Sequence, residues 1–345
     1  MIQAKTEVFY LGATGFAGSA ILHALLASDS FPAEEIALTA LVRQEKQATK
    51  LKEHYDNIST VIGTMEDTDL LKAQAAKADI VIQAGDVDNA ASMDSLMAGL
   101  ASKSVSGGGS KGTFIAVSGA GNTLDLANDV PGEVNPKVYD DKKDAAEIWN
   151  LPMERYHVAV ERKMVAEGDA HGVKNIILAP PHIYSSGYGY GKKNSFTDVT
   201  VNAMLDYGKD FVLGKGTSRA TWISTRDLAE AVGFVVKDVL DGSHNIGSGK
   251  EGYYFVHTGE TSSREIIRIV SEQLKAKGLV RKDSPVVIDA EEASSLHSFG
   301  SLLWGSNMRS RGTRLREAGW KPKELDPEPL VLNHVSAVLR QRGKA

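Results

Sequence analysis

The chain has no cysteine among its 345 residues. This absence excludes disulfide bonds, catalysis by a thiolate and metal sites built on cysteine, and it fits a reducing compartment. Basic charge is not in excess either, because 39 Lys and Arg residues stand against 44 Asp and Glu residues, giving a net charge of −5. A nucleic-acid-binding surface needs clustered basic charge, so this balance argues against one.

Long apolar runs are also absent. No run approaches the ~18 residues that span a bilayer, and residues 1–7 lack the charged-then-apolar pattern of a signal peptide. We therefore expect a cytoplasmic protein without a membrane partner. The nine histidines show no metal-ligand spacing among themselves, so no metal site is expected.

What is present is a strand–helix rhythm in the first half. Apolar strands are expected at 7–11, 36–42, 57–63, 78–85, 113–121 and 174–181. Helices are expected at 16–27, from the end of the second strand to about residue 54, at 67–77, at 90–101, and from Pro152 to Gly172. Apolar strands separated by helices predict an α/β fold with a doubly wound parallel Rossmann sheet, covered on both faces.

The rhythm changes after Pro181, which predicts two parts. Residues 1–180 are expected to form a dinucleotide-binding Rossmann domain, and residues 181–345 mainly a smaller C-terminal substrate-binding lobe with segments that return to the first domain. The Gly- and Tyr-rich stretch 184–195 is predicted to be irregular, and the Ser-rich stretch 290–301 to be mobile.

Three glycines, Gly12, Gly15 and Gly18, stand between the first strand and the first helix. Glycine suits a tight turn that phosphate oxygens approach closely, and the helix that follows offers N–H groups and the positive end of its dipole. The pattern predicts a site for a dinucleotide pyrophosphate. A glycine-rich turn without a ligand is the alternative.

The segments that carry a family resemblance occur in one order: GATGFAG, ADIVIQAGD, FIAVSGAG, LAPPHIY, FVLGKGTSRATWISTRDLAEAV and REAGWKPKE. Together they resemble the extended and atypical short-chain dehydrogenase/reductase superfamily, which includes sugar-nucleotide epimerases and reductases. The resemblance implies that the cofactor is bound by Gly12, Thr14, Gly15, Phe16, Gly18, Arg43, Ala84, Gly85, Lys163, Pro180, His182 and Ile183.

The second strand ends with ALVRQEK, so Arg43 stands where NAD-preferring sites carry an acidic residue. A guanidinium can hold a 2′-phosphate with two hydrogen bonds. This favours NADP(H). NAD(H) stays an alternative because Glu45 is close in sequence.

The family uses a Ser, a Tyr and a Lys, with the Tyr four residues before the Lys. The resemblance implies that Ser118 orients the substrate and that Lys163 holds the ribose. The usual active-site tyrosine is lacking, because Ala159 stands four residues before Lys163. Tyr156, two turns before Lys163, is the first candidate proton donor, and His157 and Lys163 itself are the others.

These observations predict an NADP(H)-dependent reductase acting on a small carbonyl or enone substrate with an atypical proton donor. Two alternatives stay open. One is a non-catalytic NAD(P) sensor that binds a partner protein. The other is a redox-neutral epimerase, dehydratase or isomerase that uses bound NAD(P). By analogy with the family, the helix through Lys163 is expected to form a homodimer interface.

Overall fold

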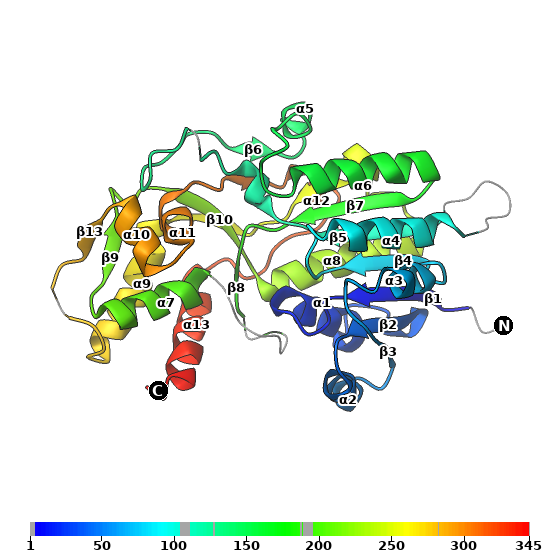
Figure 1. Ribbon diagram of the computed structural model, residues 1–345, viewed down its shortest axis with the longest axis horizontal. Coiled ribbons are helices and arrows are strands. Elements are labelled where there is room, and N and C mark those ends of the chain that lie inside the picture. Colours follow the sequence, from blue (N-terminus) through cyan, green and yellow to red (C-terminus); the bar gives the residue numbers. More distant parts are fainter. Residues whose placement is uncertain are drawn as a thin grey trace.

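The computed structural model describes residues 4–103, 111–126, 128–186, 188, 196–281 and 283–344. Its main sheet has seven parallel strands in the order β11-β7-β5-β4-β1-β2-β3 (Figure 1). The strands are β1 (Thr6–Leu11), β2 (Ile36–Val42), β3 (Ile58–Ile62), β4 (Ile80–Gln83), β5 (Thr113–Val117), β7 (Lys174–Ala179) and β11 (Tyr253–Phe255). The order reverses beside β1, which opens a crevice at the carboxyl ends of the strands. The predicted doubly wound sheet is confirmed.

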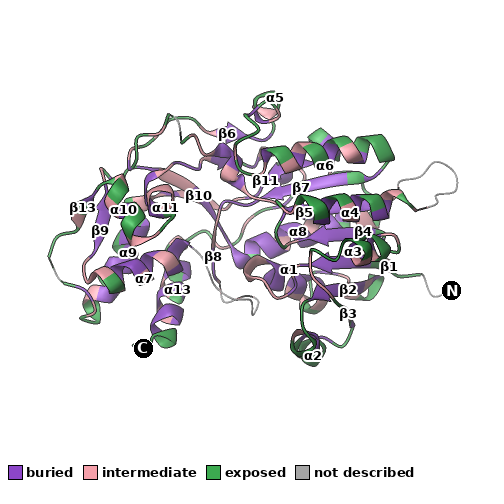
Figure 2. Cartoon of the chain, in the orientation of Figure 1, coloured by how far each residue is buried: buried purple, intermediate pink, exposed green. Residues whose placement is uncertain are grey.

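Helices cover both faces of this sheet. On one face lie α1 (Phe16–Ala27), α2 (Glu45–His54) and α8 (Thr225–Asp241), and on the other lie α3 (Thr68–Ala75), α4 (Ala90–Ala101) and α6 (Val158–His171). Successive strand residues point to opposite faces, so Val8 and Tyr10 pack under α1 and α8 while Phe9 and Leu11 pack under the other helices. The strands are therefore almost wholly buried (Figure 2).

A second, smaller lobe lies beside the carboxyl ends of the strands (Figure 1). Its sheets are β12 (Gly259–Ser262), β10 (Arg219–Ser224) and β8 (His182–Tyr184) in that order, and β13 (Val286–Ile288) with β9 (Phe211–Leu213). Its helices are α7 (Phe196–Tyr207), α9 (Ser263–Ala276), α10 (Ala290–Leu296), α11 (Gly300–Gly305) and α13 (Pro327–Gln341). The lobe has its own core around Phe211 and Trp304.

Shorter elements lie between the elements given above. They are η1 (Ala33–Glu35), η3 (Ala120–Thr123), β6 (Tyr139–Asp140), α5 (Ala145–Ile148), η4 (Gly249–Gly252), β14 (Ser310–Arg311) and α12 (Thr313–Glu317). Segments of the second half return to the main sheet, because β11 pairs with β7 and α8 packs on α1. The Asp227 carboxylate of α8 joins this helix to the chain at residue 258 and at residues 323–324. It accepts hydrogen bonds from the N–H groups of Lys323 and Glu324 and from the Thr258 hydroxyl.

Two local expectations differ from the structure. The helix expected from Pro152 begins only at Val158, because the backbone of His157 is left-handed (φ 67°) and interrupts the helix there. The stretch expected to be mobile at 290–301 forms α10 and the start of α11, and the Asp289 side chain caps α10 by accepting from the N–H of Glu292. Residues 187 and 189–195 of the stretch predicted to be irregular lie outside the described residues. None of the helices in the described part is long and apolar enough to cross a membrane.

Candidate dinucleotide and substrate site

The turn after β1 requires glycine at positions 12 and 18. Gly12 has a φ of +93°, and a Cβ on it would lie 2.4 Å from the main chain of Ala84 at the end of β4. A Cβ on Gly18 would lie 2.0 Å from the Gly12 carbonyl oxygen. The N–H of Gly15 donates to that same oxygen (2.9 Å), which closes the turn. The main chain is thereby exposed on the crevice side, where a phosphate can approach it.

The start of α1 is left open for an anion. Gly15 is its N-cap and supplies no side-chain hydrogen bond, and no acidic residue lies in the first turn. The N–H groups of that turn and the positive end of the helix dipole therefore face the crevice without a capping oxygen. The ring of Phe16 packs against His334 of α13, which brings the lobe to the same corner.

Arg43 lies next to the glycine turn. Its N–H donates to the Gln47 side-chain oxygen (2.9 Å), and the Gln47 amide donates to the Thr14 hydroxyl (3.2 Å). Gln47 thus holds the turn after β2 against the turn after β1. The guanidinium of Arg43 is exposed, and no ion pair is recorded for it within the described residues. This uncovered backbone cradle with a free cation beside it fits a dinucleotide.

Three more of the predicted cofactor residues, Ala84, Gly85 and Pro180, directly follow strands of the main sheet. Ala84 and Gly85 follow β4, and the Gly85 N–H donates to the buried side-chain oxygen of Gln83. The Pro180 carbonyl accepts from the N–H of Ala120, which joins the chain after β7 to the chain after β5.

Two further predicted cofactor residues lie in the lobe's first strand. His182 and Ile183 belong to β8, which pairs with β10. Burial lowers the pKa of His182 to about 4, so its ring is neutral at pH 7.

Ser118 contacts a residue that the sequence analysis did not consider. Its hydroxyl donates to Glu161 Oε1 of α6 at 2.6 Å. Glu161 is only 3% exposed, and burial raises the pKa of its carboxyl to about 8. The Asn122 amide lies between Glu161 Oε2 (3.4 Å) and the Tyr253 hydroxyl (2.6 Å). The end of β5 therefore carries a buried polar network with a carboxyl that is protonated at pH 7.

His157 forms a second polar pair next to the first. Its Nδ1 lies 2.9 Å from the carboxylate of Asp88, in the loop between β4 and α4. Its Nε2 faces the main chain after Ser118, since a Cβ on Gly119 would lie 2.7 Å from it. His157 and His244 are the two residues other than glycine with positive φ in the described part of the chain.

Neither of the other two predicted catalytic residues forms a hydrogen bond with Ser118 or Glu161 in the described part of the chain. The Lys163 ammonium is 2.6 Å from Asp94 of α4, and both side chains, about half exposed, line a cavity between α4 and α6 together with His157. Tyr156 is 45% exposed and faces the lobe. The structure thus brings Ser118 together with Glu161, and not with Lys163 or Tyr156.

The sequence analysis missed Asp88 and Glu161. One signal for Glu161 was available: it follows His157 by four residues, which is the spacing of the family's Tyr and Lys. The sequence analysis instead assigns the Tyr and Lys positions to Ala159 and Lys163, two residues further along the chain. Nothing in the sequence marks Asp88, because its contact joins residues 69 positions apart.

A small cavity lies between the main domain and the lobe. Its volume is about 330 Å³. Its lining includes Leu126, Asp129, Tyr156, Phe299, Leu302 and Ser306. Gly121, three residues after Ser118, packs against Tyr156 in the lining of this cavity, since a Cβ on Gly121 would lie 3.1 Å from Tyr156 Cβ.

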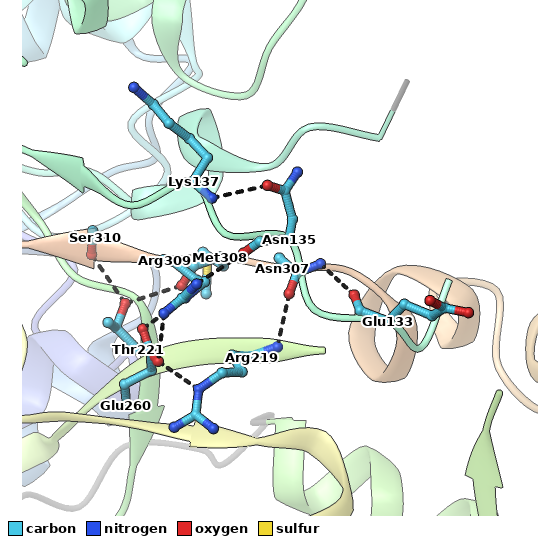
Figure 3. A network of polar contacts seen from close by, with 10 residues as sticks. All are labelled: Glu133, Asn135, Lys137, Arg219, Thr221, Glu260, Asn307, Met308, Arg309 and Ser310. Carbon is cyan, nitrogen blue, oxygen red and sulfur yellow. Dashed lines mark hydrogen bonds and ion pairs between the residues drawn. The ribbon is translucent and has the colours of Figure 1, made fainter. Parts of the chain in front are cut away.

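Two arginines behind this cavity are already paired. Figure 3 shows that Arg219 and Arg309 converge on the Glu260 carboxylate, at 2.6 and 2.9 Å. Burial alone would raise the pKa of Glu260, but the two guanidinium groups hold it below its usual value. Asn307 connects this network to the cavity, since it donates from its amide to the Glu133 carbonyl and from its N–H to Asp129.

Comparisons with known proteins agree with this geometry. Residues 12–151 match the NAD(P)H-binding family, and residues 130–247 match the NAD dependent epimerase/dehydratase family. The chain is 29% identical over 333 residues to Oxidase ucsJ from Acremonium sp, which covers 92% of each protein.

Solved structures share the fold. One is dTDP-glucose 4,6-dehydratase from Bacillus anthracis in complex with NAD (TM-score 0.65, 14% identity, 98% of each chain). Another is vestitone reductase from alfalfa (TM-score 0.62, 14% identity, 99% of this chain and 100% of the other). At these identities the likeness is one of fold.

Proposed function

Because the chain belongs to the extended and atypical short-chain dehydrogenase/reductase superfamily, we propose that it is an NADP(H)-dependent oxidoreductase that reduces a small carbonyl or enone compound. The glycine turn and the start of α1 would hold the pyrophosphate, and Arg43 the 2′-phosphate. Bound NADPH would supply a hydride to the substrate carbon. Ser118 would donate a hydrogen bond to the substrate oxygen.

The observation that carries this proposal is the cavity between domain and lobe. Its volume of about 330 Å³ suits one small organic molecule. Tyr156, Phe299 and Leu302 give it aromatic and aliphatic walls. A sensor that only signals to another protein has no use for such a cavity between its main domain and its lobe.

The charge network behind the cavity argues against a sugar nucleotide as substrate. A diphosphate needs cationic groups that are free to bind it. Arg219 and Arg309 are the cations nearest to this position in the network, and both are bound to Glu260. A diphosphate would have to displace a partly buried carboxylate that holds two guanidinium hydrogen bonds, which is unfavourable.

Cofactor preference can be tested by calorimetric titration with NADPH and NADH. Arg43→Ala removes the proposed 2′-phosphate contact, which is a charge-assisted interaction of about 1.5–3 kcal/mol. We expect NADPH affinity to fall about 10- to 100-fold and NADH affinity to change little. Lys46→Ala removes an equally exposed positive charge from the first turn of α2 and should change neither. Equal losses for both dinucleotides in Arg43→Ala would contradict the preference for NADPH.

The reaction can be tested by following NADPH absorbance at equimolar protein with a panel of aldehydes, ketones and enones. We expect oxidation of NADPH with at least one compound. Sugar nucleotides are included, and their conversion without net loss of NADPH would favour an epimerase or dehydratase. Tight NADPH binding without oxidation by any compound would favour the sensor.

A further inference from the structure

His157 and Glu161, at the start of α6, are four residues apart, which is the spacing between the Tyr and the Lys of the family. We propose that His157, held by Asp88, is the catalytic residue that exchanges a proton with the substrate oxygen. Glu161 is a positioning residue that fixes the Ser118 hydroxyl beside it. This inference rests on the proposed reductase function and supplies the proton donor that Ala159 cannot be.

The contacts of His157 leave one nitrogen for chemistry. Asp88 accepts from Nδ1 at 2.9 Å, which fixes the ring orientation and stabilises a proton on that nitrogen. Nε2 has no recorded hydrogen-bond partner within the described residues, and it lies against Gly119, directly after Ser118. A carbonyl oxygen that accepts from the Ser118 hydroxyl would therefore lie on the Nε2 side of the ring.

The backbone of His157 is held in a costly conformation. A φ of 67° is left-handed, which is unfavourable for a residue with a Cβ. A glycine at this position would relieve the strain, and an asparagine would reduce it. Such outliers are found at functional sites, where the surrounding contacts maintain them. Here the contacts with Asp88 and Gly119 do so, and they aim the imidazole at the end of β5.

Glu161 has the contacts of a support rather than of a donor. It is 3% exposed, and Ser118 and Asn122 occupy both of its oxygens, so the substrate reaches it only through Ser118. Its raised pKa, about 8, keeps it neutral at pH 7. It therefore adds no second negative charge beside Asp88. When a substrate binds, the protonated Glu161 carboxyl can donate its O–H to the Ser118 oxygen, so that the Ser118 hydroxyl turns to the substrate oxygen.

A second cavity gives His157 a route to water. It has a volume of about 340 Å³ and lies between α4 and α6, away from the substrate cavity. Asp88 and His157 both line it, and the His157 side chain is 20% exposed. A proton taken from Nε2 during one turnover can be replaced from water on this side.

The proton balance of the reduction is closed by these groups. The substrate carbon gains the hydride with its electron pair, and the former C=O pair moves to the oxygen. That oxygen takes the proton from His157 Nε2, so the carbonyl becomes an alcohol and the ring becomes neutral. One proton from bulk solvent, delivered as hydronium or by a buffer acid, then restores the proton on the ring, so the reduction consumes one proton per turnover.

Charged groups surround His157 on each element packed against it. They are Asp88 in the loop before α4, Asp94 on α4, Arg155 in the turn before α6, and Glu161, Lys163 and Glu167 on α6. Lys163 is paired with Asp94 and Arg155 with Asp125, which leaves Asp88 as the carboxylate that acts directly on the ring.

The test uses His157→Asn, because asparagine tolerates the left-handed backbone but cannot carry the proton. We expect kcat to fall at least 100-fold with unchanged NADPH affinity, and added imidazole to restore part of the rate through the α4–α6 cavity. The matched control is His171→Asn, an exposed histidine at the end of the same helix, which should keep full activity.

A second readout needs no turnover. The imidazole signals of the apo protein are recorded by NMR at a fixed pH. We expect Asp88→Asn to change the chemical shifts of the His157 ring, because the Asp88 carboxylate contacts its Nδ1, and to leave those of His171 unchanged. Full kcat in His157→Asn, a loss of kcat in Tyr156→Phe alone, or His157 chemical shifts insensitive to Asp88→Asn overturns the inference.

Failure of the proposed function gives a different pattern. A wild-type protein that binds NADPH and oxidises none refutes the reductase and with it the catalytic role of His157. The NMR comparison of wild type and Asp88→Asn then still shows whether Asp88 holds the ring. If the wild type and His157→Asn are equally active, His157 is not the proton donor, and the proposed reductase function still holds.

Discussion

Glu161→Gln should change how the stability of the protein depends on pH. Burial raises the pKa of the Glu161 carboxyl from its ordinary value of 4.5 to about 8. Between these two values the folded protein holds a proton that the unfolded chain has lost. The free energy of unfolding therefore falls as pH rises through this window, by about 1.4 kcal/mol per pH unit. At pH 7 the raised pKa of Glu161 has lowered the free energy of unfolding of the wild type by about 3 kcal/mol.

Other shifted groups act mostly below pH 7. Asp141 has a pKa raised to about 6, and its effect has the same sign but ends there. Burial lowers the pKa of His182 to about 4 and that of His257 to about 3. For these two the unfolded chain binds the extra proton, so stability rises with pH up to about their ordinary value of 6.5. The amide of Glu161→Gln does not titrate, so subtracting the variant from the wild type cancels all three contributions.

The assay is urea denaturation of both proteins at pH 5, 6, 7 and 8. The amide can accept the Ser118 hydrogen bond as the carboxyl does. We expect the difference in unfolding free energy to move in favour of the variant by about 2.5 kcal/mol between pH 5 and 7. Glu53→Gln, an exposed position on α2, is the control and should give a constant difference. Parallel pH profiles for wild type and Glu161→Gln would refute the reasoning, because Glu161 would then be ionised in the folded protein.

Two further substitutions test the cofactor turn and the contact that ties the halves together. Gly18→Ala places a Cβ 2.0 Å from a carbonyl oxygen of the glycine turn, so NADPH binding measured by calorimetry should be lost while circular dichroism stays native. Gly233→Ala in α8 has only one neighbour, at 3.8 Å, and should bind NADPH normally; weakened binding there would point to a general loss of structure. Asp227→Ala leaves two N–H groups and a hydroxyl without their acceptor and should lower the unfolding free energy by about 3 kcal/mol. Asp241→Ala on the exposed part of α8 should change it by less than about 0.5 kcal/mol, and equal losses in urea would argue against the role of Asp227.

The sheet and the glycine turn could be read from the sequence because both depend on local properties. The helices at 16–27 and 90–101 and the strand at 36–42 have the expected bounds, since apolar spacing and turn residues define them. Gly12 and Gly18 are required by steric contacts within a few residues or with the adjacent strand.

The catalytic side of the site could not be read in this way. The start of α6 depends on the backbone of His157, which is held by Asp88 from a loop 69 positions earlier. The burial of Glu161 depends on Ser118, 43 positions away, and on β11. Sequence spacing alone therefore favoured Lys163, whose exposed side chain instead pairs with Asp94.

The two halves of the site differ in what builds them, and this difference bears on the chemistry. The dinucleotide half is built mainly of main chain, at the glycine turn and the start of α1. The substrate half is made of side chains, and here Glu260 neutralises two arginines while a histidine and a glutamate stand at the Tyr and Lys spacing. A buried neutral glutamate costs stability at pH 7, as worked out above. A carboxyl buried at such a cost is better explained by its hold on Ser118 than by folding.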